Sequence, residues 1–199
     1  MGKKTSASQI YETALKIFAK YGFRRTRVED IAQELDMATG TLYRYIKDKN
    51  DLYEKTVEFG IIRWQRKVFE AIAEVDDVKT RFITMCTKGY EYLSEDIHLR
   101  EIMIHDPSIF PLSPRRVRFP HIDNASITLL KDILSQGIKE DVFRKVDVTH
   151  VAELLYSIYV MFIIKTYIKS EEQSTQKMFN EGLTILLYGL LKTNEVTSQ

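Results

Sequence analysis

The sequence predicts an all-α protein of about nine helices, with a small N-terminal unit and a larger helical body. Apolar residues recur every three or four positions along most of the chain, which is the period of an amphipathic helix. No stretch of any length alternates apolar and polar residues as a half-buried strand does. Glycines, prolines and capping residues separate the segments, so their boundaries can be placed.

The charge distribution divides the chain into two unlike parts. Residues 1–50 carry ten Lys and Arg against six Asp and Glu, whereas the remainder carries 19 against 22. The net charge of the whole chain is only +1. A basic end on a mildly acidic body is the asymmetry expected when one end faces phosphate, although chance clustering gives the same numbers.

The composition favours a soluble, cytoplasmic protein with no membrane partner. The single cysteine, Cys86, excludes an intrachain disulfide framework and is best interpreted as a small buried hydrophobe. The N-terminal residues contain no apolar signal segment. The longest apolar run, Leu154–Ile164, is about half the ~20 residues that a membrane-spanning helix needs.

The first two predicted helices cover residues 6–22 and 26–35. Capping boxes, in which a side chain satisfies a free amide at the helix start, are expected to begin at Ser6 and Thr26. Gly22 is expected to end the first helix in a left-handed conformation. Each helix has one apolar face, so the two can pack together.

A third short helix, about residues 39–45, follows a tight break. Asp36 lies at the break, where a left-handed residue is expected, and Asp tolerates that conformation better than most residues. The helix begins at Ala38 or Thr39. Three short helices with a steep crossing between the last two form a helix-turn-helix.

The third helix carries polar and small residues suited to a DNA groove. Thr39, Gly40 and Thr41 lie at its N-terminus, the part of a recognition helix that reads base edges in the major groove. Threonine can hydrogen-bond a base or touch a thymine methyl, and Gly40 lets the backbone approach closely. Arg44 is a candidate for a base or phosphate contact. The full set of predicted DNA-contacting residues is Arg27, Thr39, Gly40, Thr41, Tyr43, Arg44, Tyr45 and Lys49.

These residues carry a resemblance to the DNA-binding domain of the tetracycline-repressor (TetR) family, over about the first 55 residues. The matching residues include Ile10, Ala14, Ile17, Phe18, Gly22, Thr26, Val28, Asp30, Ile31, Ala32, Gly40, Thr41, Leu42, Tyr43, Tyr45, Ile46, Lys49 and Leu52. The chain departs from the family at Asp36, where a Gly is usual, and at Ala38, where a capping Ser is usual. The resemblance implies DNA contacts by Arg27, Thr39, Thr41, Tyr43, Tyr45 and Lys49. It also implies a domain of residues 1–50 for DNA binding and one of residues 51–199 for regulation.

The body is predicted to consist of further amphipathic helices. A long helix runs from Lys49 to about Val75, and shorter helices follow at 78–94 and 96–105. Four prolines between residues 107 and 120 forbid a continuous helix there. The remaining helices are expected at 122–136, ending at Gly137, then from Asp147 or Thr149 to about 170, and at 172–192.

The last two helices are apolar on more than one face, so most of each surface must be buried. A 199-residue chain has little spare mass to cover both helices. The simplest way to bury these apolar surfaces is to pack them against a second copy of the chain. Two helices from each copy would form a four-helix bundle, which predicts a homodimer. Burial inside a monomer is the alternative. TetR-like proteins dimerise through the corresponding helices, and a dimer predicts a roughly palindromic double-stranded DNA operator.

The body is rich in Met, Phe and Tyr, which suits either a pocket for a small lipophilic or aromatic effector or a plain core. The candidate pocket residues are Trp64, Met85, Tyr90, Met103, His105, Phe110, Tyr159 and Phe162. The function expected is a DNA-binding regulator, such as a repressor released by a ligand.

Two alternatives remain open: control by a protein partner, and a helical enzyme with a ligand pocket. The chain has no phosphate-binding glycine loop, paired-carboxylate or nucleophile motif. His98, His105 and His121 do not have metal-ligand spacing. We therefore expect no enzyme activity, no cofactor and no metal.

Overall fold

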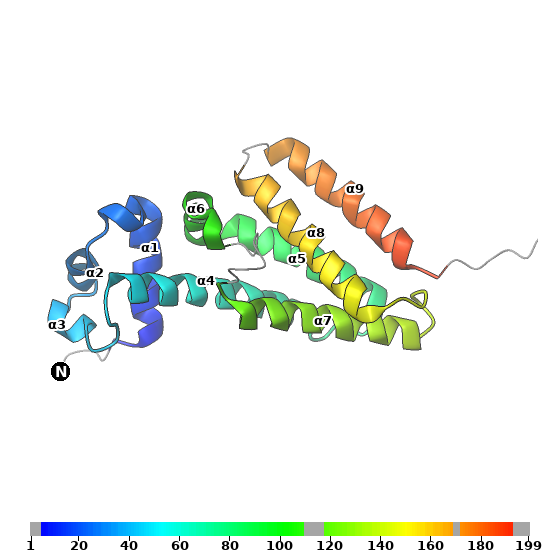
Figure 1. The fold of residues 1–199 in the computed structure, drawn as a ribbon, viewed down its shortest axis with the longest axis horizontal. Coiled ribbons are helices and arrows are strands. Elements are labelled where there is room, and N and C mark those ends of the chain that lie inside the picture. The colour runs from blue at the N-terminus through cyan, green and yellow to red at the C-terminus, as the bar shows by residue number, and fades with distance from the viewer. Residues whose placement is uncertain (1–4, 110–117, 169–171, 193–199) are drawn as a thin grey trace, which may run out of the picture.

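The computed structural model describes residues 5–109, 118–168 and 172–192. Within these ranges the chain forms nine α-helices and one 3-10 turn, Pro107–Ile109, which confirms the all-α fold class. The helices are α1 Ala7–Arg25, α2 Val28–Glu34, α3 Thr39–Leu42, α4 Lys49–Ile72, α5 Val78–Glu95, α6 Ile97–His105, α7 Pro120–Lys139, α8 Val148–Ile168 and α9 Glu172–Leu190. The molecule is elongated, with α1 to α3 at one end and α4 leading from them into the body (Figure 1).

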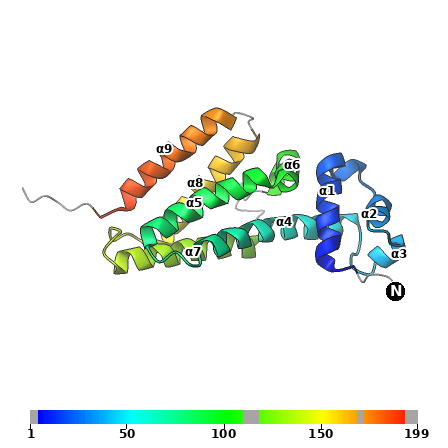
Figure 2. The same cartoon turned by 180° about the vertical axis from the view of Figure 1, so that it is seen from behind.

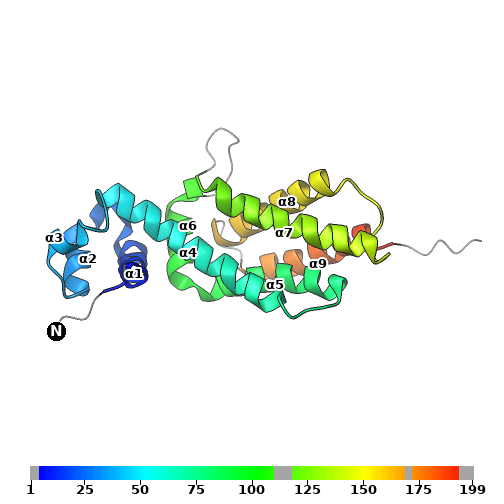
Figure 3. The ribbon, with the colours of Figure 1, turned by 90° about the horizontal axis from the view of Figure 1, so that it is seen from below.

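The body is a helical bundle built along α4. Seen from behind, α5 lies beside α4, with α8 and α9 forming an antiparallel pair (Figure 2). Seen from below, α7 runs alongside α8 and crosses near α4 (Figure 3). The helices α4, α5, α7 and α8 therefore surround a common interior.

The first helix continues to Arg25, past the end predicted at Gly22, and Thr26 has a different role from the one expected. Gly22 has a φ of 73°, which interrupts α1 before its last turn. The Thr26 hydroxyl donates to the Gly22 carbonyl at 2.9 Å, so Thr26 caps the end of α1. The predicted capping box from Thr26 to Glu29 is wrong. Arg27 is the N-cap of α2, and its amide donates to the Asp30 carboxylate at 3.0 Å.

The break before α3 has the predicted left-handed residue, since Asp36 has a φ of 51°. The recognition helix is shorter than expected, because only Thr39–Leu42 is α-helical and the following residues form a turn. Ala38 is the N-cap and supplies no side-chain hydrogen bond, so Thr39 is the first helical residue and not the cap.

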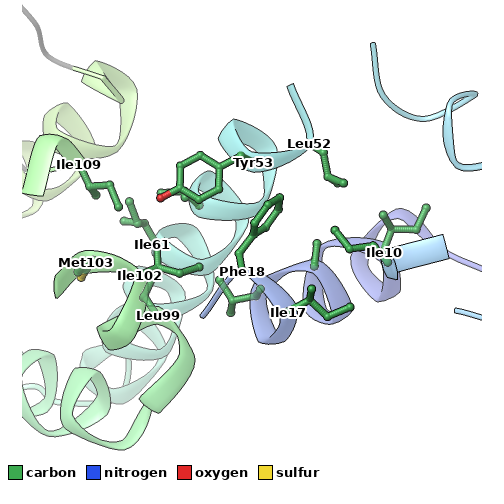
Figure 4. Close-up of a cluster of buried hydrophobic side chains, with 14 of the residues drawn as sticks. Ile10, Ile17, Phe18, Leu52, Tyr53, Ile61, Leu99, Ile102, Met103 and Ile109 are labelled. Atoms are coloured by element: carbon green, nitrogen blue, oxygen red, sulfur yellow. The ribbon is translucent and has the colours of Figure 1, made fainter. Parts of the chain in front are cut away.

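One apolar core joins the N-terminal helices to the body. Phe18 of α1 packs edge-on against Tyr53 of α4, with ring centroids 5.0 Å apart, and Leu99 and Ile102 of α6 belong to the same buried cluster (Figure 4). Gly60 permits the closest approach. A Cβ atom there would lie 2.9 Å from a Leu99 methyl carbon and 3.3 Å from one of Leu15.

Polar contacts reinforce the same junction. Arg63 of α4 forms ion pairs with Glu12 of α1 and with Asp96 at the start of α6. The guanidinium therefore connects α4 with both α1 and the start of α6. The expected domain boundary at residue 50 falls in the first turn of α4, and the buried cluster extends across it.

A second set of polar contacts holds the segment after α6 against the start of α4. The Tyr53 hydroxyl donates to the Asp106 carboxylate at 3.0 Å, and the Arg118 guanidinium donates to the same carboxylate at 2.8 Å. Arg118 also pairs with Glu54 at 2.5 Å. The Arg118 side chain is mostly buried, so these contacts are better shielded than surface ion pairs.

Three predicted boundaries in the body differ from the structure. The helix that begins at Lys49 ends at Ile72 and not near Val75. Helix α7 begins at Pro120 and continues through Gly137, which does not stop it. The reason is packing, because the ring of buried Phe143 occupies the space beside Gly137.

The sequence allowed α8 to begin at Asp147 or at Thr149. The structure favours Asp147, because its carboxylate accepts a hydrogen bond from the His150 amide at 3.0 Å.

Replacing Gly137 with Ala should destabilise the protein by about 1–3 kcal/mol, because the new methyl group overpacks the core. Its Cβ would lie 2.1 Å from the Phe143 ring. Urea unfolding followed by circular dichroism measures the loss. Ser135→Ala on the exposed side of the same helix is the control and should change stability by less than about 0.5 kcal/mol. Equal stability of the two variants would refute the close contact.

Candidate nucleic-acid interface and apolar cavity

The surface around α3 is open and carries small polar side chains. Gly40 and Arg44 are exposed, Thr39 and Thr41 are half-buried, and Tyr43 is 45% exposed. A Cβ atom at Gly40 would meet nothing within 4 Å, so the backbone itself faces open space. These five predicted residues therefore lie on one short, solvent-accessible segment.

Arg27 lies at the other end of the same unit, at the N-terminus of α2, with an exposed side chain. The α2 amides point in this direction, and Glu29 and Asp30 occupy the first turn of the helix. Asp30 is bound to the Arg27 amide.

Two predicted DNA-contacting residues have additional structural roles. The half-buried Tyr45 donates its hydroxyl to the Thr5 carbonyl at 3.4 Å, and its own carbonyl accepts from Lys55 at 3.1 Å. The Lys49 ammonium donates to the carbonyls of Thr26 at 2.9 Å and Arg24 at 3.3 Å.

The Lys49 ammonium also lies 4.5 Å from the centre of the Phe23 ring. The sequence did not predict that Lys49 binds the end of α1, because residue spacing does not show that this end lies next to the start of α4. An ammonium has three donors, so the two carbonyls use two of the three N–H groups of Lys49.

A largely apolar cavity of about 140 Å³ lies inside the body. A single water needs only about 10–15 Å³, so this space is sufficient for a small organic group or part of a chain. The cavity is bounded by residues of α4, α5, α7, α8 and α9, with contributions from α6 and the turn after it. Five of the predicted pocket residues line it: Trp64, Met85, Met103, Tyr159 and Phe162.

The other three predicted pocket residues are not placed in the cavity. Tyr90 is buried beside it and stacks on Phe179 with ring centroids 4.8 Å apart, so it supports the wall from behind. His105 is exposed at the end of α6, with Nδ1 2.7 Å from the Glu101 carbonyl oxygen. Phe110 lies outside the described residues.

The cavity also has a polar group that the sequence reasoning missed. Gln65 of α4 donates from Nε2 to the Ser126 hydroxyl and to the Ile122 carbonyl, each at 2.9 Å. Asp123 of α7 accepts a hydrogen bond from the Tyr156 hydroxyl of α8. A carboxylate three residues before a serine on an otherwise apolar helix face is the sequence signal that could have indicated it.

Burial changes the pKa values of the Asp123 carboxyl and of the Tyr156 hydroxyl that binds it. It raises the pKa of Asp123, although the Tyr156 hydrogen bond and the nearby His121 act in the opposite direction. Burial also raises the pKa of the Tyr156 hydroxyl, so this group keeps its proton. Cys86, on the same wall, has its pKa raised by burial to about 12 and is a neutral thiol at pH 7. The cavity therefore contains no reactive thiolate.

The described residues contain no group of three or more His, Cys, Asp or Glu side chains that could hold a metal ion.

The helices α8 and α9 expose an unusual amount of apolar surface. Leu154 and Met161 on α8 are 58% and 56% exposed, and Ile185 and Tyr188 on α9 are 70% and 69% exposed. Among the described residues, the α8 segment Val148–Thr166 is long and apolar enough to cross a membrane by length and composition. Helices that pack against other protein helices meet the same criterion.

Comparison with known proteins finds similarity to bacterial transcriptional regulators. Residues 10–56 match the family model described as bacterial regulatory proteins of the tetR family. The fatty acid metabolism regulator protein of Bacillus subtilis is 21% identical over 189 residues, which cover 94% of this chain and 97% of that protein. The HTH-type transcriptional repressor KstR2 of Mycobacterium tuberculosis is 24% identical over 189 residues, which cover 92% of each chain.

The fold has the same relatives. The crystal structure of the regulator FadR from Bacillus subtilis in complex with stearoyl-CoA has a TM-score of 0.74 at 20% identity, and the match covers 92% of this chain and 99% of that one. At this identity the likeness shows a shared fold.

Replacing Asp123 with Asn should raise the melting temperature more at pH 8 than at pH 4.5. A carboxyl in an unfolded chain titrates near about pH 3.9, and burial raises the pKa of Asp123 above that value in the folded protein. As the pH rises through this window, the unfolded state ionises more readily, so the wild-type protein loses stability. Asn keeps an acceptor for Tyr156 and does not ionise.

Thermal unfolding at the two pH values measures this difference. Asp132→Asn, at an exposed position of the same helix, is the matched control and should show no such pH dependence. An equal gain at both pH values for Asp123→Asn would exclude the buried charge as its cause.

Proposed function

The chain belongs to the TetR family of bacterial transcriptional regulators, and we propose that it is a dimeric repressor whose binding to operator DNA is released by a lipophilic effector. It is accordingly a DNA-binding regulator and not an enzyme. One observation carries the proposal: helix α4 leads from the DNA-reading unit and also forms a wall of the apolar cavity. Regulators of this family are typically cytoplasmic, and we expect the same location here.

We assign base reading to the exposed N-terminal part of α3. Thr39, Gly40 and Thr41 lie where a recognition helix meets base edges, and the open space beside Gly40 supports a close backbone approach. Arg27 and Tyr43 flank this face and suit phosphate contacts. Lys49 offers its remaining N–H to phosphate while it holds the end of α1.

We assign dimerisation to α8 and α9. Their exposed apolar side chains would cost free energy in water, at about 25 cal/mol per Å² of apolar surface. A second copy of the chain packed on these helices removes that surface from water. Two-fold symmetry then presents two reading units, which predicts an operator with two inverted half-sites.

We assign effector binding to the apolar cavity. An apolar group or part of an apolar chain suits it, and the relatives named for fatty acid regulation and the FadR complex with stearoyl-CoA support an acyl chain as one candidate. The ligand must bind better to the state that does not bind DNA, because equal affinity for both states shifts no equilibrium. Trp64, Gln65 and Val68 of α4 line the cavity, so a ligand there contacts the helix that carries the reading unit.

Replacing Arg27 with Ala should weaken binding to every DNA sequence and reduce the salt dependence. Removing one phosphate contact lowers the slope of log K against log salt by about 1 per protomer. Fluorescence anisotropy with an operator selected from random duplex DNA, at several salt concentrations, measures both effects. Arg66→Ala, in the exposed middle of α4, is the control and should leave the slope unchanged.

The same assay tests the proposed function as a whole. Thr41→Val should change base preference at one position of each half-site, by about 1–3 kcal/mol. Absence of DNA binding by the wild-type protein at low salt would refute the function. If the protein binds DNA but no lipophilic compound changes that binding, the DNA-binding function stands and the proposed control by an effector is refuted.

Replacing Ile185 with Asp should convert the dimer to a monomer and weaken operator binding, because it places a charge within a dry interface. Light scattering after size-exclusion chromatography measures the mass. Ile97→Asp is the matched control, since Ile97 is also exposed but lies on α6. A dimer that survives Ile185→Asp and dissociates with Ile97→Asp would move the interface to the other side of the molecule.

A further inference from the structure

Charge is distributed unevenly over the cavity wall. Asp123 is the one acidic side chain that lines the cavity among the described residues, and no Lys, Arg or His of this part of the chain lines it. Nearly all other lining groups are apolar. A single carboxyl in such surroundings costs free energy unless other groups satisfy it.

The hydrogen bonds of Asp123 leave one side of the carboxyl open. Its Oδ1 accepts from the Tyr156 hydroxyl, and the structure shows no other hydrogen bond to this carboxyl within the described ranges. His121 is two residues away, but its Nε2 lies 2.9 Å from the Glu58 carboxylate. Asp123 lines the cavity, and its second carboxyl oxygen accepts no hydrogen bond from the described residues.

Gln65 adds a second acceptor at the same place. Its amide nitrogen already donates to the Ser126 hydroxyl and the Ile122 carbonyl, so both amide hydrogens are used. Its carbonyl oxygen remains an acceptor. Asp123 and Ser126 lie one turn apart on α7, and Gln65 binds Ser126, so the Asp123 carboxyl and the Gln65 amide lie near one another in the cavity lining; we refer to this part of the lining as one end of the cavity.

We propose that this end of the cavity, formed by Asp123, Gln65, Ser126 and Tyr156, binds a hydrogen-bond-donating group, an ammonium or a hydroxyl, on an otherwise apolar effector. The inference rests on the proposed function, since it names the chemistry of that effector. A ligand carboxylate does not suit this end, because it brings a second negative charge and only acceptors. An acyl chain can occupy the apolar part provided that its group at this end is a donor.

The position of the site also couples the ligand to the reading unit. Gln65 lies on α4, Asp123 on α7 and Tyr156 on α8. A donor held between Asp123 and Gln65 bridges α7 to α4. A ligand that lacks the donor fills the apolar space without this bridge, so it is expected to bind more weakly.

The test uses four ligands with the same ten-carbon chain: decylamine, 1-decanol, 2-decanone and decanoate. Binding to the purified wild-type dimer is measured without DNA by calorimetry at pH 7.5. Decylamine should bind at least about tenfold more tightly than decanoate, and 1-decanol about tenfold more tightly than 2-decanone, which has an acceptor only. A factor of ten corresponds to about 1.4 kcal/mol.

Variants identify the group responsible. Asp123→Asn should reduce the preference for decylamine over decanoate by about tenfold, whereas Asp132→Asn on the same helix should preserve it. Equal or tighter binding of decanoate and 2-decanone to the wild-type protein would overturn the proposal, and so would an unchanged preference in Asp123→Asn. The wild-type comparison decides the matter even where a variant does not fold.

The direct binding measurement separates this proposal from the proposed function. Ligands that follow the expected order but never release DNA would support the donor site and contradict effector control. DNA release by decanoate, with no preference for a donor, would support effector control and contradict the donor site.

Discussion

The close packing of α1, α4 and α6 around Gly60 is the constraint on which the rest of the structure depends. Two leucine side chains fill the space where a side chain at Gly60 would lie, and Arg63 pairs with acids on both flanking elements one turn later. Side chains packed this closely leave little free volume at the junction to absorb a shift of these helices. A displacement of α4 or α6 in the body must therefore move α1, and with it the reading unit.

Several side chains near this junction serve the fold and the surface together. Lys49 binds two backbone carbonyls at the end of α1, and Tyr45 contacts the chain just before that helix. Both residues lie at the edge of the proposed DNA interface. Their contacts join the residues before α1 and after its end to the turn after α3 and to α4, so they set the geometry of the proposed interface.

The cavity also contains side chains that both hold helices together and are available to a ligand. Its walls are mostly apolar, and its polar groups gather where α4, α7 and α8 meet. The hydrogen bonds there are interhelical, so they position α4 as well as offering acceptors to a ligand. Apolar contact supplies non-directional affinity, whereas a few oriented polar groups decide which ligands fit. The helices α8 and α9 carry exposed apolar side chains in addition to those that line the cavity.

The sequence by itself determined the helical class, most helix limits and the composition of the reading face, because periodicity, capping and glycine act over a few residues. It indicated the positive φ of Gly22 and Asp36, and five of its candidate pocket residues line the cavity. It misplaced the start of α2 and the end of α7, since Thr26 bonds back to Gly22, and Phe143 folds over Gly137. Only the tertiary structure decided the roles of Lys49, Tyr45 and Asp123, because their partners are brought close by the packing of separate helices and no local pattern encodes such distances.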